Sequence, residues 1–331
     1  MRAPGKLILW GEYAVLAGAP AAAIAVNCYA TATFEAAPWT REWAIDTPGL
    51  QQSTVQRRLD RLLIESFPDS KDPTALLWHV LTSLGPSAAE LPLGAHLTLD
   101  SRAFARDGRK LGLGSSAAVT VALSALLQQQ LKQSPSFELA LRAHRSLQGG
   151  KGSGMDVATA FCGGAGIVGL QGGQDGSAPA IETAPWPKDL HWRAYWTGSS
   201  ASTPGHIGRF DTWRQHAPDL RALDALSAAA AALTERFEPR TFAAYSDTLW
   251  QFDQTAQLGI YSEAHAQLRA LAAKSGVTYK PCGAGGGDCG IAISSDVEAL
   301  SRFDARLANE APPSTQPLDL RLATHGIAEP R

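Results

Sequence analysis

The sequence has few cysteines, and their spacing argues against both metal sites and a disulfide framework. The four are Cys28, Cys162, Cys282 and Cys289, and no two of them have the CxxC spacing of a metal site. They are also too few and too scattered for the disulfide-rich scaffold of a small secreted protein. We therefore expect reduced thiols in a cytoplasmic protein.

The chain also lacks an excess of charge and a long apolar run. Its 29 lysines and arginines face 31 aspartates and glutamates, so the net charge is −2 and nucleic acid is a poor partner. The most apolar run, residues 14–26, contains Gly18 and Pro20 and is too short to cross a bilayer. The N-terminal segment reaches Glu12 too early for a signal peptide. We expect neither nucleic acid nor membrane as a partner.

Several familiar catalytic motifs are missing. There is no GxxxxGK[ST], which excludes a P-loop NTPase, and no GxSxG elbow of the serine hydrolases. The eight histidines form no HExxH or other paired metal spacing, and we expect His144 to be packed or on the surface rather than catalytic. Gly112-x-Gly114-x-x-Ala117 fits the loose dinucleotide fingerprint, but a polar loop precedes it instead of a buried strand.

What is present is a mixture of helix and strand patterns over 331 residues, long enough for two domains. Apolar and alternating runs predict strands at 6–10, 21–34, 94–100, 166–170, 191–196, 290–294 and 318–323. Helical spacing predicts helices at 53–68, 73–84, 115–132, after Ser136, within 218–274 and at 297–309. Residues 171–179 are the best linker candidate. We expect an α+β protein with domains 1–172 and 173–331.

Three glycine-rich segments carry the candidate chemistry, and the first is GLGSSAA at 112–118. It follows Arg109 and Lys110 and opens a helix. The free N–H groups and the dipole of a helix start favour an anion, glycines let a phosphate approach, and serine hydroxyls add donors or a metal ligand. An ordinary N-capped helix would use similar residues. Phosphate binding is the interpretation that we favour.

The second segment, GGKGSGMDVATA at 149–160, places Asp156 where the glycines stop and a helix begins. Asp156 is either a first-turn carboxylate of that helix or a group at the edge of an anion site that takes or orients a proton, and the residues alone leave both open. The third segment, GAGGGDCG at 283–290, has five glycines in eight residues, which predicts a close backbone approach. We expect Asp288 to cap backbone groups there.

Taken in order, PGKLILWGEYAVL, GLGSSAAVTVAL and KPCGAGGGDCGIA resemble the three signature motifs of the GHMP kinases, and they span nearly the whole chain. The resemblance implies a phosphotransferase with a ribosomal S5-like N-terminal domain and a ferredoxin-like C-terminal domain. ATP and Mg²⁺ would be its cofactors, with substrate between the domains, in a monomer or homodimer.

Within the family, GRKLGLGSSAA, QGGKGSGMDVATAFCGG, YWTGSSAST and KPCGAGGGDCGIA are similar to the branch that acts on phosphomevalonate. The implied reaction converts ATP and (R)-5-phosphomevalonate to ADP and 5-diphosphomevalonate in the mevalonate pathway of isoprenoid biosynthesis. Mevalonate kinase or another small-alcohol kinase is an alternative, as is a decarboxylase of the same fold. From a different class, the chain could be an inactive sensor or binding protein that keeps the fold.

The resemblance also assigns residues. Lys6 and Asp156 would be the catalytic pair. ATP phosphates would lie against Gly112, Leu113, Gly114, Ser115, Ser116 and Ala117, with Ser116 also a Mg²⁺ ligand. Substrate-binding candidates are Lys110, Lys151, Ser153, Gly154, Ser200, Ser202, Thr203, Gly285, Gly286 and Gly287.

One residue departs from the mevalonate kinase pattern. Arg145 stands eleven residues before Asp156, where mevalonate kinase has a Mg²⁺-binding glutamate, so the second metal ligand is unassigned. A phosphorylated acceptor also needs more local cations than an unphosphorylated one, because it adds negative charge beside ATP. Lys110, Lys151, Arg193 and Lys280 lie beside predicted loops and are either such cations or solvated surface residues.

Overall fold

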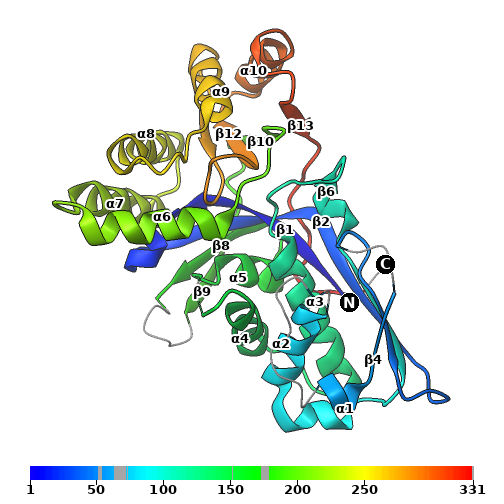
Figure 1. Cartoon of the computed structure of the whole chain (residues 1–331). Coiled ribbons are helices and arrows are strands. Elements are labelled where there is room, and N and C mark those ends of the chain that lie inside the picture. Colours follow the sequence, from blue (N-terminus) through cyan, green and yellow to red (C-terminus); the bar gives the residue numbers. More distant parts are fainter. Residues whose placement is uncertain (51–53, 63–71, 73, 151, 173–178, 330–331) are drawn as a thin grey trace.

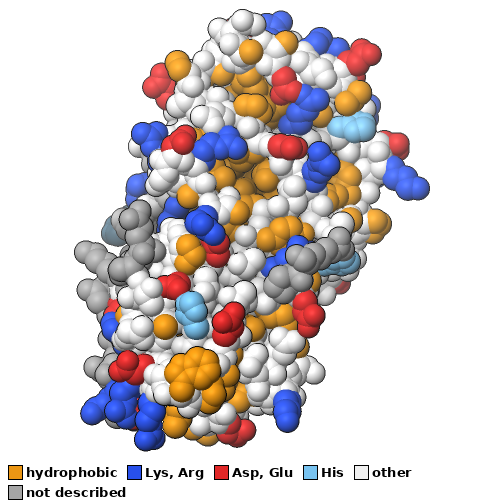
Figure 2. Space-filling view, turned by 90° about the vertical axis from the view of Figure 1, so that its right-hand side faces the viewer, with side chains coloured by type: hydrophobic (Ala, Val, Ile, Leu, Met, Phe, Trp, Pro, Cys, Tyr) orange, Lys and Arg blue, Asp and Glu red, His pale blue; other side chains and the backbone are white. Residues whose placement is uncertain are grey.

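The computed structural model describes residues 1–50, 54–62, 72, 74–150, 152–172 and 179–329. Two sheets organise the chain, and helices cover each of them (Figure 1). None of the described helices is long and apolar enough to cross a membrane. On the face shown in Figure 2, acidic and basic side chains are interspersed, as the balanced charge predicts.

The N-terminal sheet is built around one long strand, β2 (Ala21–Ala36). It pairs antiparallel with β1 (Arg2–Trp10) along one edge, and with β8 (Gly166–Gln171) and β5 (Ala95–Asp100) at its two ends. The sheet is completed by β3 (Trp43–Asp46), β4 (Val55–Arg57) and β9 (Ala180–Pro185). The first six residues of β2 are all buried, and their small alanines let helices pack closely on the sheet.

Helices α3 (Ser115–Gln130) and α5 (Met155–Cys162) pack on β1 and β2, and α4 (Phe137–Leu147) and α2 (Ala75–Leu84) form the next layer. Helix α3 lies between the sheet and the outer helices, which explains why its alanine, valine and leucine side chains are buried on nearly every side. Shorter elements complete this half: α1 (Leu59–Leu62), η1 (Ala14–Ala17), η2 (Gly85–Glu90), η3 (Arg102–Phe104), β6 (Ala105–Arg106) and β7 (Arg109–Lys110).

The C-terminal sheet has four antiparallel strands in the order β11 (Thr278–Pro281), β12 (Cys289–Ser294), β10 (His191–Trp196) and β13 (Gln316–Leu318). Its helices are α6 (Thr203–His216), α7 (Arg221–Glu235), α8 (Pro239–Ala256), α9 (Glu263–Lys274) and α10 (Val297–Glu310). Helices α9 and α10 pack against the sheet, while α7 packs on α8 and against η1 of the N-terminal half. This strand order is the ferredoxin-like one that the resemblance implied.

The predicted domain boundary at residue 172 falls inside a hairpin. Strand β9 pairs with β8, so residues up to Pro185 extend the N-terminal sheet. The C-terminal segment then returns to the same sheet, where Leu322 bridges to Val26 and Ala328 to Arg2. Strand pairing therefore assigns residues 180–185 and the C-terminal tail to the N-terminal half.

Some element predictions are wrong. Residues 55–57 form strand β4 instead of a helix, and the helix that follows has one turn, Leu59–Leu62, while residues 63–68 of that prediction lie outside the described residues. The terminal strand occupies Gln316–Leu318, not 318–323. The polar loop before the first glycine motif contains the β6–β7 hairpin, whose turn uses Asp107 and Gly108 at φ 50 and 72.

Candidate active site

The three glycine-rich segments meet at one cavity of about 600 Å³. Strand β1 contributes Lys6, the start of α3 contributes Gly112–Ser116, and the loop before β12 contributes Gly283, Ala284 and Asp288. Asp156, at the start of α5, completes this set of wall residues. Segments separated by more than a hundred residues in sequence therefore converge where the motifs predict a ligand.

The first glycine segment forms an open helix start. Gly114 is the N-cap of α3, at φ 82 and ψ 38, and Gly112 also has a positive φ of 77. Because the N-cap is glycine, no N-cap side chain takes up the free N–H groups of the first turn, which stay available to an anion. Ser116 is exposed on the cavity wall.

The same segment is held against β1. The amide of Lys6 donates to the Leu113 carbonyl at 2.9 Å, and Lys6 Nζ lies 3.5 Å from the Gly112 carbonyl. A Cβ on Gly114 would lie 3.1 Å from Lys6 Cγ, so glycine keeps this contact close. Ala117 is buried behind the loop and is not part of the cavity wall. Its predicted contact with ATP stays a prediction.

Asp156 is the second residue of α5, and its side chain is 27% exposed. Its Oδ1 accepts the N–H of Val157 at 3.0 Å, a first-turn contact of the kind that the helix-cap interpretation predicts. Lys6 and Asp156 both line the cavity, but within the described part of the chain they form no direct ion pair. The structure thus brings the predicted pair to one cavity without joining the two side chains.

The third glycine segment approaches protein groups rather than open space. Gly285 lies against Ile260 and Gly286 against His206, each without room for a Cβ, and a Cβ on Gly287 would lie only 3.0 Å from Ser199. The Gly286 amide also donates to the Ile260 carbonyl at 2.8 Å. Gly283 and Ala284 line the cavity instead. The predicted close backbone approach is present, while closure of Gly285–Gly287 over a ligand stays a prediction.

Asp288 has the capping role that the sequence predicts, although it caps a neighbouring loop. Its Oδ1 accepts the Ala201 amide at 3.1 Å, and its backbone carbonyl accepts the Thr197 amide at 3.0 Å. Burial raises the pKa of the Asp288 carboxyl, against the opposing effect of the Ala201 N–H and of Lys6. Asp288 thus joins the third glycine segment to residues 197–201.

Only some of the residues predicted to bind substrate line the cavity. Lys110, exposed at the end of β7, lines the cavity together with Ser153 and Ser202. Ser202 is the N-cap of α6 and accepts the Gly205 amide at 3.3 Å, whereas Ser200 donates to the Lys110 carbonyl at 2.9 Å and holds the β6–β7 hairpin. Gly154 is the N-cap of α5 at φ 85. Lys151 and the side chain of Thr203 lie outside the described part of the chain.

Two of the four candidate cations belong to other contacts. Arg193, on β10, pairs with Asp304 of α10, away from the cavity. Lys280, on β11, is fully buried and pairs with Glu12. It is therefore neither a cation for the acceptor phosphate nor a solvated surface residue, the two alternatives that the sequence left open. Arg145, at the position of the missing metal ligand, donates to the Ser153 carbonyl at 3.5 Å.

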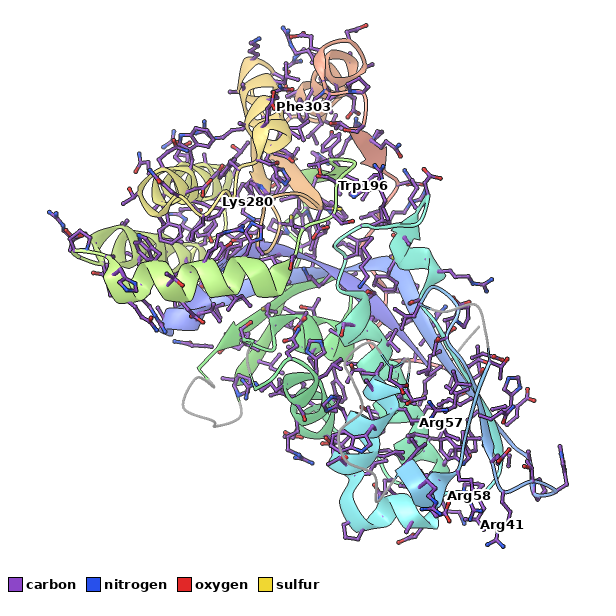
Figure 3. The ribbon with its side chains drawn as sticks, in the orientation of Figure 1. Arg41, Arg57, Arg58, Trp196, Lys280 and Phe303 are labelled. Carbon is purple, nitrogen blue, oxygen red and sulfur yellow. The ribbon has the colours of Figure 1, made fainter. Side chains whose placement is uncertain are left out.

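Sequence reasoning missed Glu12, which lies under the cavity in a buried polar network. Its Oε2 accepts the Tyr245 hydroxyl at 2.6 Å, and its Oε1 pairs with Lys280. Lys280, labelled in Figure 3, also donates to the Ile8 carbonyl at 3.3 Å, which ties β11 to β1 across the two halves. Burial, followed by the nearby Glu12 charge, raises the pKa of the Tyr245 hydroxyl. The available signal was a glutamate inside the largely apolar first motif, PGKLILWGEYAVL.

Comparison with known proteins identifies the family of the chain. Residues 75–164 match the family model described as the GHMP kinases N terminal domain. The phosphomevalonate kinase of Streptomyces sp. (strain CL190) is 31% identical over 98% of this chain and 97% of its own. The chain belongs to the GHMP kinase family, so it is a kinase, and the predicted two-domain α+β fold is confirmed.

Two further comparisons place it within that family. The mevalonate kinase of Thermococcus sibiricus is 27% identical over 94% of this chain and 93% of its own. A solved structure of Streptococcus pneumoniae phosphomevalonate kinase in complex with phosphomevalonate and AMPPNP has a TM-score of 0.77 at 20% identity, covering 98% of this chain and 99% of its own. The likeness to that structure concerns the fold.

Proposed function

We propose that the protein transfers the γ-phosphoryl group of ATP to (R)-5-phosphomevalonate, which gives ADP and 5-diphosphomevalonate. The observation that carries this proposal is the meeting of an uncapped glycine helix start, Lys6, Asp156 and Lys110 on one cavity. Similarity to a phosphomevalonate kinase along nearly the whole chain supports the choice of acceptor.

The start of α3 would hold the ATP phosphates. Its free N–H groups and the glycines at 112 and 114 offer donors and close backbone approach to an anion. Phosphoryl transfer depends on positioning and charge neutralisation more than on a protein nucleophile. Backbone donors with a lysine beside them therefore suit this chemistry.

The wall residues also fit Mg²⁺. This ion prefers oxygen ligands, keeps several waters and is held largely by substrate phosphates. The Ser116 hydroxyl and the Asp156 carboxylate offer oxygen ligands on the cavity wall, and the described residues contain no cluster of three His, Cys, Asp or Glu side chains that would form an all-protein metal cage. When bound, Mg²⁺ supplies charge neutralisation at the transferring phosphoryl group.

The acceptor decides what Lys6 and Asp156 must do. The attacking atom of phosphomevalonate is a phosphate oxygen, which has largely lost its proton at neutral pH, since the second pKa of a phosphate monoester is about 6. Lys6 then lowers the negative charge around that oxygen, and Asp156 orients the groups around it and takes up any proton that remains. Lys110, which lines the cavity, would hold the phosphate of the acceptor.

A substrate panel tests the proposal. ADP release, followed with a coupled assay, should occur with phosphomevalonate and not with mevalonate alone. Strong turnover of mevalonate alone would replace the proposal with a mevalonate kinase. Release of CO₂ would indicate a decarboxylase, and absence of any turnover would indicate a binding protein.

Two variants test the catalytic pair. Asp156→Ala and Lys6→Ala should each lower kcat by about 10³-fold or more, and the aspartate change should leave the affinity for ATP nearly unaltered. Circular dichroism of both variants confirms that they are folded. Normal activity in Asp156→Ala would remove Asp156 from the mechanism.

A further inference from the structure

The imidazole of His144 lies directly behind Asp156. His144 is in the last turn of α4 and is 1% exposed, so it is packed, which is one of the two environments that the sequence predicts for it. Its Nε2 lies 3.9 Å from Asp156 Oδ2. What the sequence did not indicate is that this buried ring faces the carboxylate at the edge of the cavity.

The Nε2 atom of His144 makes no hydrogen bond within the described part of the chain. Nε2 of His144 is buried and has no hydrogen-bond partner there, which is unfavourable for a polar atom shielded from water. Asp156 Oδ1 already accepts the Val157 amide, while Oδ2 points toward the ring. The 3.9 Å separation exceeds the upper limit of a normal N–H···O hydrogen bond by about 0.7 Å.

Close packing of the two helices holds this arrangement. Gly154, the N-cap of α5, lies against Leu141 of α4, where an added Cβ would come within 2.5 Å of the leucine Cδ1. Leu141 is one turn before His144 on the same helix. The glycine therefore leaves room for the Leu141 side chain where α5 begins beside α4.

We propose that His144 is a positioning residue for Asp156, an inference that rests on the proposed function of that aspartate. With both substrates bound, the Nε2–H group of His144 donates a hydrogen bond to Asp156 Oδ2. Each carboxylate oxygen accepts more than one hydrogen bond, so the remaining lone pairs stay directed at the cavity. The result is a single carboxylate orientation toward Lys6 and the reacting phosphates.

Two substitutions separate this role from simple packing. His144→Leu fills the space without a donor, whereas His144→Gln keeps an N–H group near the position of Nε2. We expect His144→Leu to lower kcat about tenfold to a hundredfold without changing the KM for ATP, and His144→Gln to keep most of the activity. His79→Leu is the matched control, because His79 is fully buried, contacts α4 through Ser146 at 2.8 Å and is not part of the cavity wall. It should retain the wild-type kcat.

A double variant tests whether the effect passes through Asp156. If it does, His144→Leu added to Asp156→Asn should lower the residual rate no further. The inference would be overturned if the losses of kcat in the two single variants were additive in the double variant. It would also be overturned if a folded His144→Gln lost as much kcat as His144→Leu. If His144→Leu does not fold, the kcat of His144→Gln decides the question. If Asp156→Asn is inactive but His144→Leu is fully active, the role of His144 is refuted while the role of Asp156 stands. A fully active Asp156→Asn would refute the proposed function of Asp156 itself.

Discussion

Replacement of Lys280 by methionine removes one member of a buried ion pair and leaves the other in place. The side chains of Lys280 and Glu12 are both 0% exposed, so water does not take the place of the lost ammonium. Glu12 keeps the Tyr245 hydroxyl at 2.6 Å and a long contact of 3.5 Å with the Gly283 amide. Breaking a buried pair in this way typically destabilises by about 3–5 kcal/mol. Because Tyr245 still donates to the carboxylate, we expect the lower end of that range.

Urea unfolding measures this loss through the fluorescence of the nine tryptophans. The matched control is Lys274→Met, because Lys274 pairs with Glu310 at 3.8 Å on the surface, where both side chains are well exposed. That variant should lose less than about 1 kcal/mol. The double variant Glu12→Gln/Lys280→Met should recover part of the stability, since no unpaired charge remains. A loss below about 1 kcal/mol for Lys280→Met, or a double variant no more stable than Lys280→Met, would refute the reasoning.

Three further predictions use other residues. Burial lowers the pKa of His265 from 6.5 to about 4. Between those values the unfolded chain binds a proton that the folded chain does not, so the folded state loses up to about 3 kcal/mol of stability as the pH is lowered from 6.5 to about 4; urea titrations of His265→Gln should show a smaller loss. Gly112→Ala, with φ 77 and a Cβ that meets Asp288, should weaken ATP binding and lower the melting temperature. Gly108→Ala, at φ 72 in open space, should lower the melting temperature without weakening ATP binding. Lys110→Met should raise the KM for phosphomevalonate about tenfold to a hundredfold and leave the KM for ATP unchanged. Equal increases in both KM values would contradict a role of Lys110 at the acceptor phosphate.

Local signals in the sequence predicted much of the scaffold. Helix α3 begins at Ser115, where the sequence predicts it, and α4 follows Ser136, whose hydroxyl accepts the Leu139 amide at 3.2 Å. Such signals are read from a few neighbouring residues, because a helix start needs an N-cap and a strand needs an apolar run. The three motif segments were also found this way.

Helix α6 shows where local signals fail. Residues 204–208 contain a proline and two glycines, which argue against a helix. The helix nevertheless forms, because proline is tolerated in a first turn, Ser202 caps it, and Phe210 packs between Tyr13 and Trp213. Tyr13 belongs to the other half of the chain. Its contribution to α6 has no signal in the sequence around residue 210.

The pairing of Glu12 with Lys280 was not predicted for the same reason, because the two residues lie 268 positions apart in the sequence and local patterns do not link them. That pair changes how the charge of the cavity is counted. Among the described wall residues, the cationic side chains are Lys6 and Lys110, and the negative charge of Glu12 is already balanced by Lys280. Asp156 and Asp288 place two further carboxyl groups at the wall. If the acceptor is phosphorylated, as we propose, two lysines are too few to neutralise its phosphate and those of ATP together. We therefore predict that the backbone N–H groups of α3 and Mg²⁺ carry most of that neutralisation, so that activity depends steeply on Mg²⁺ even where ATP binding does not.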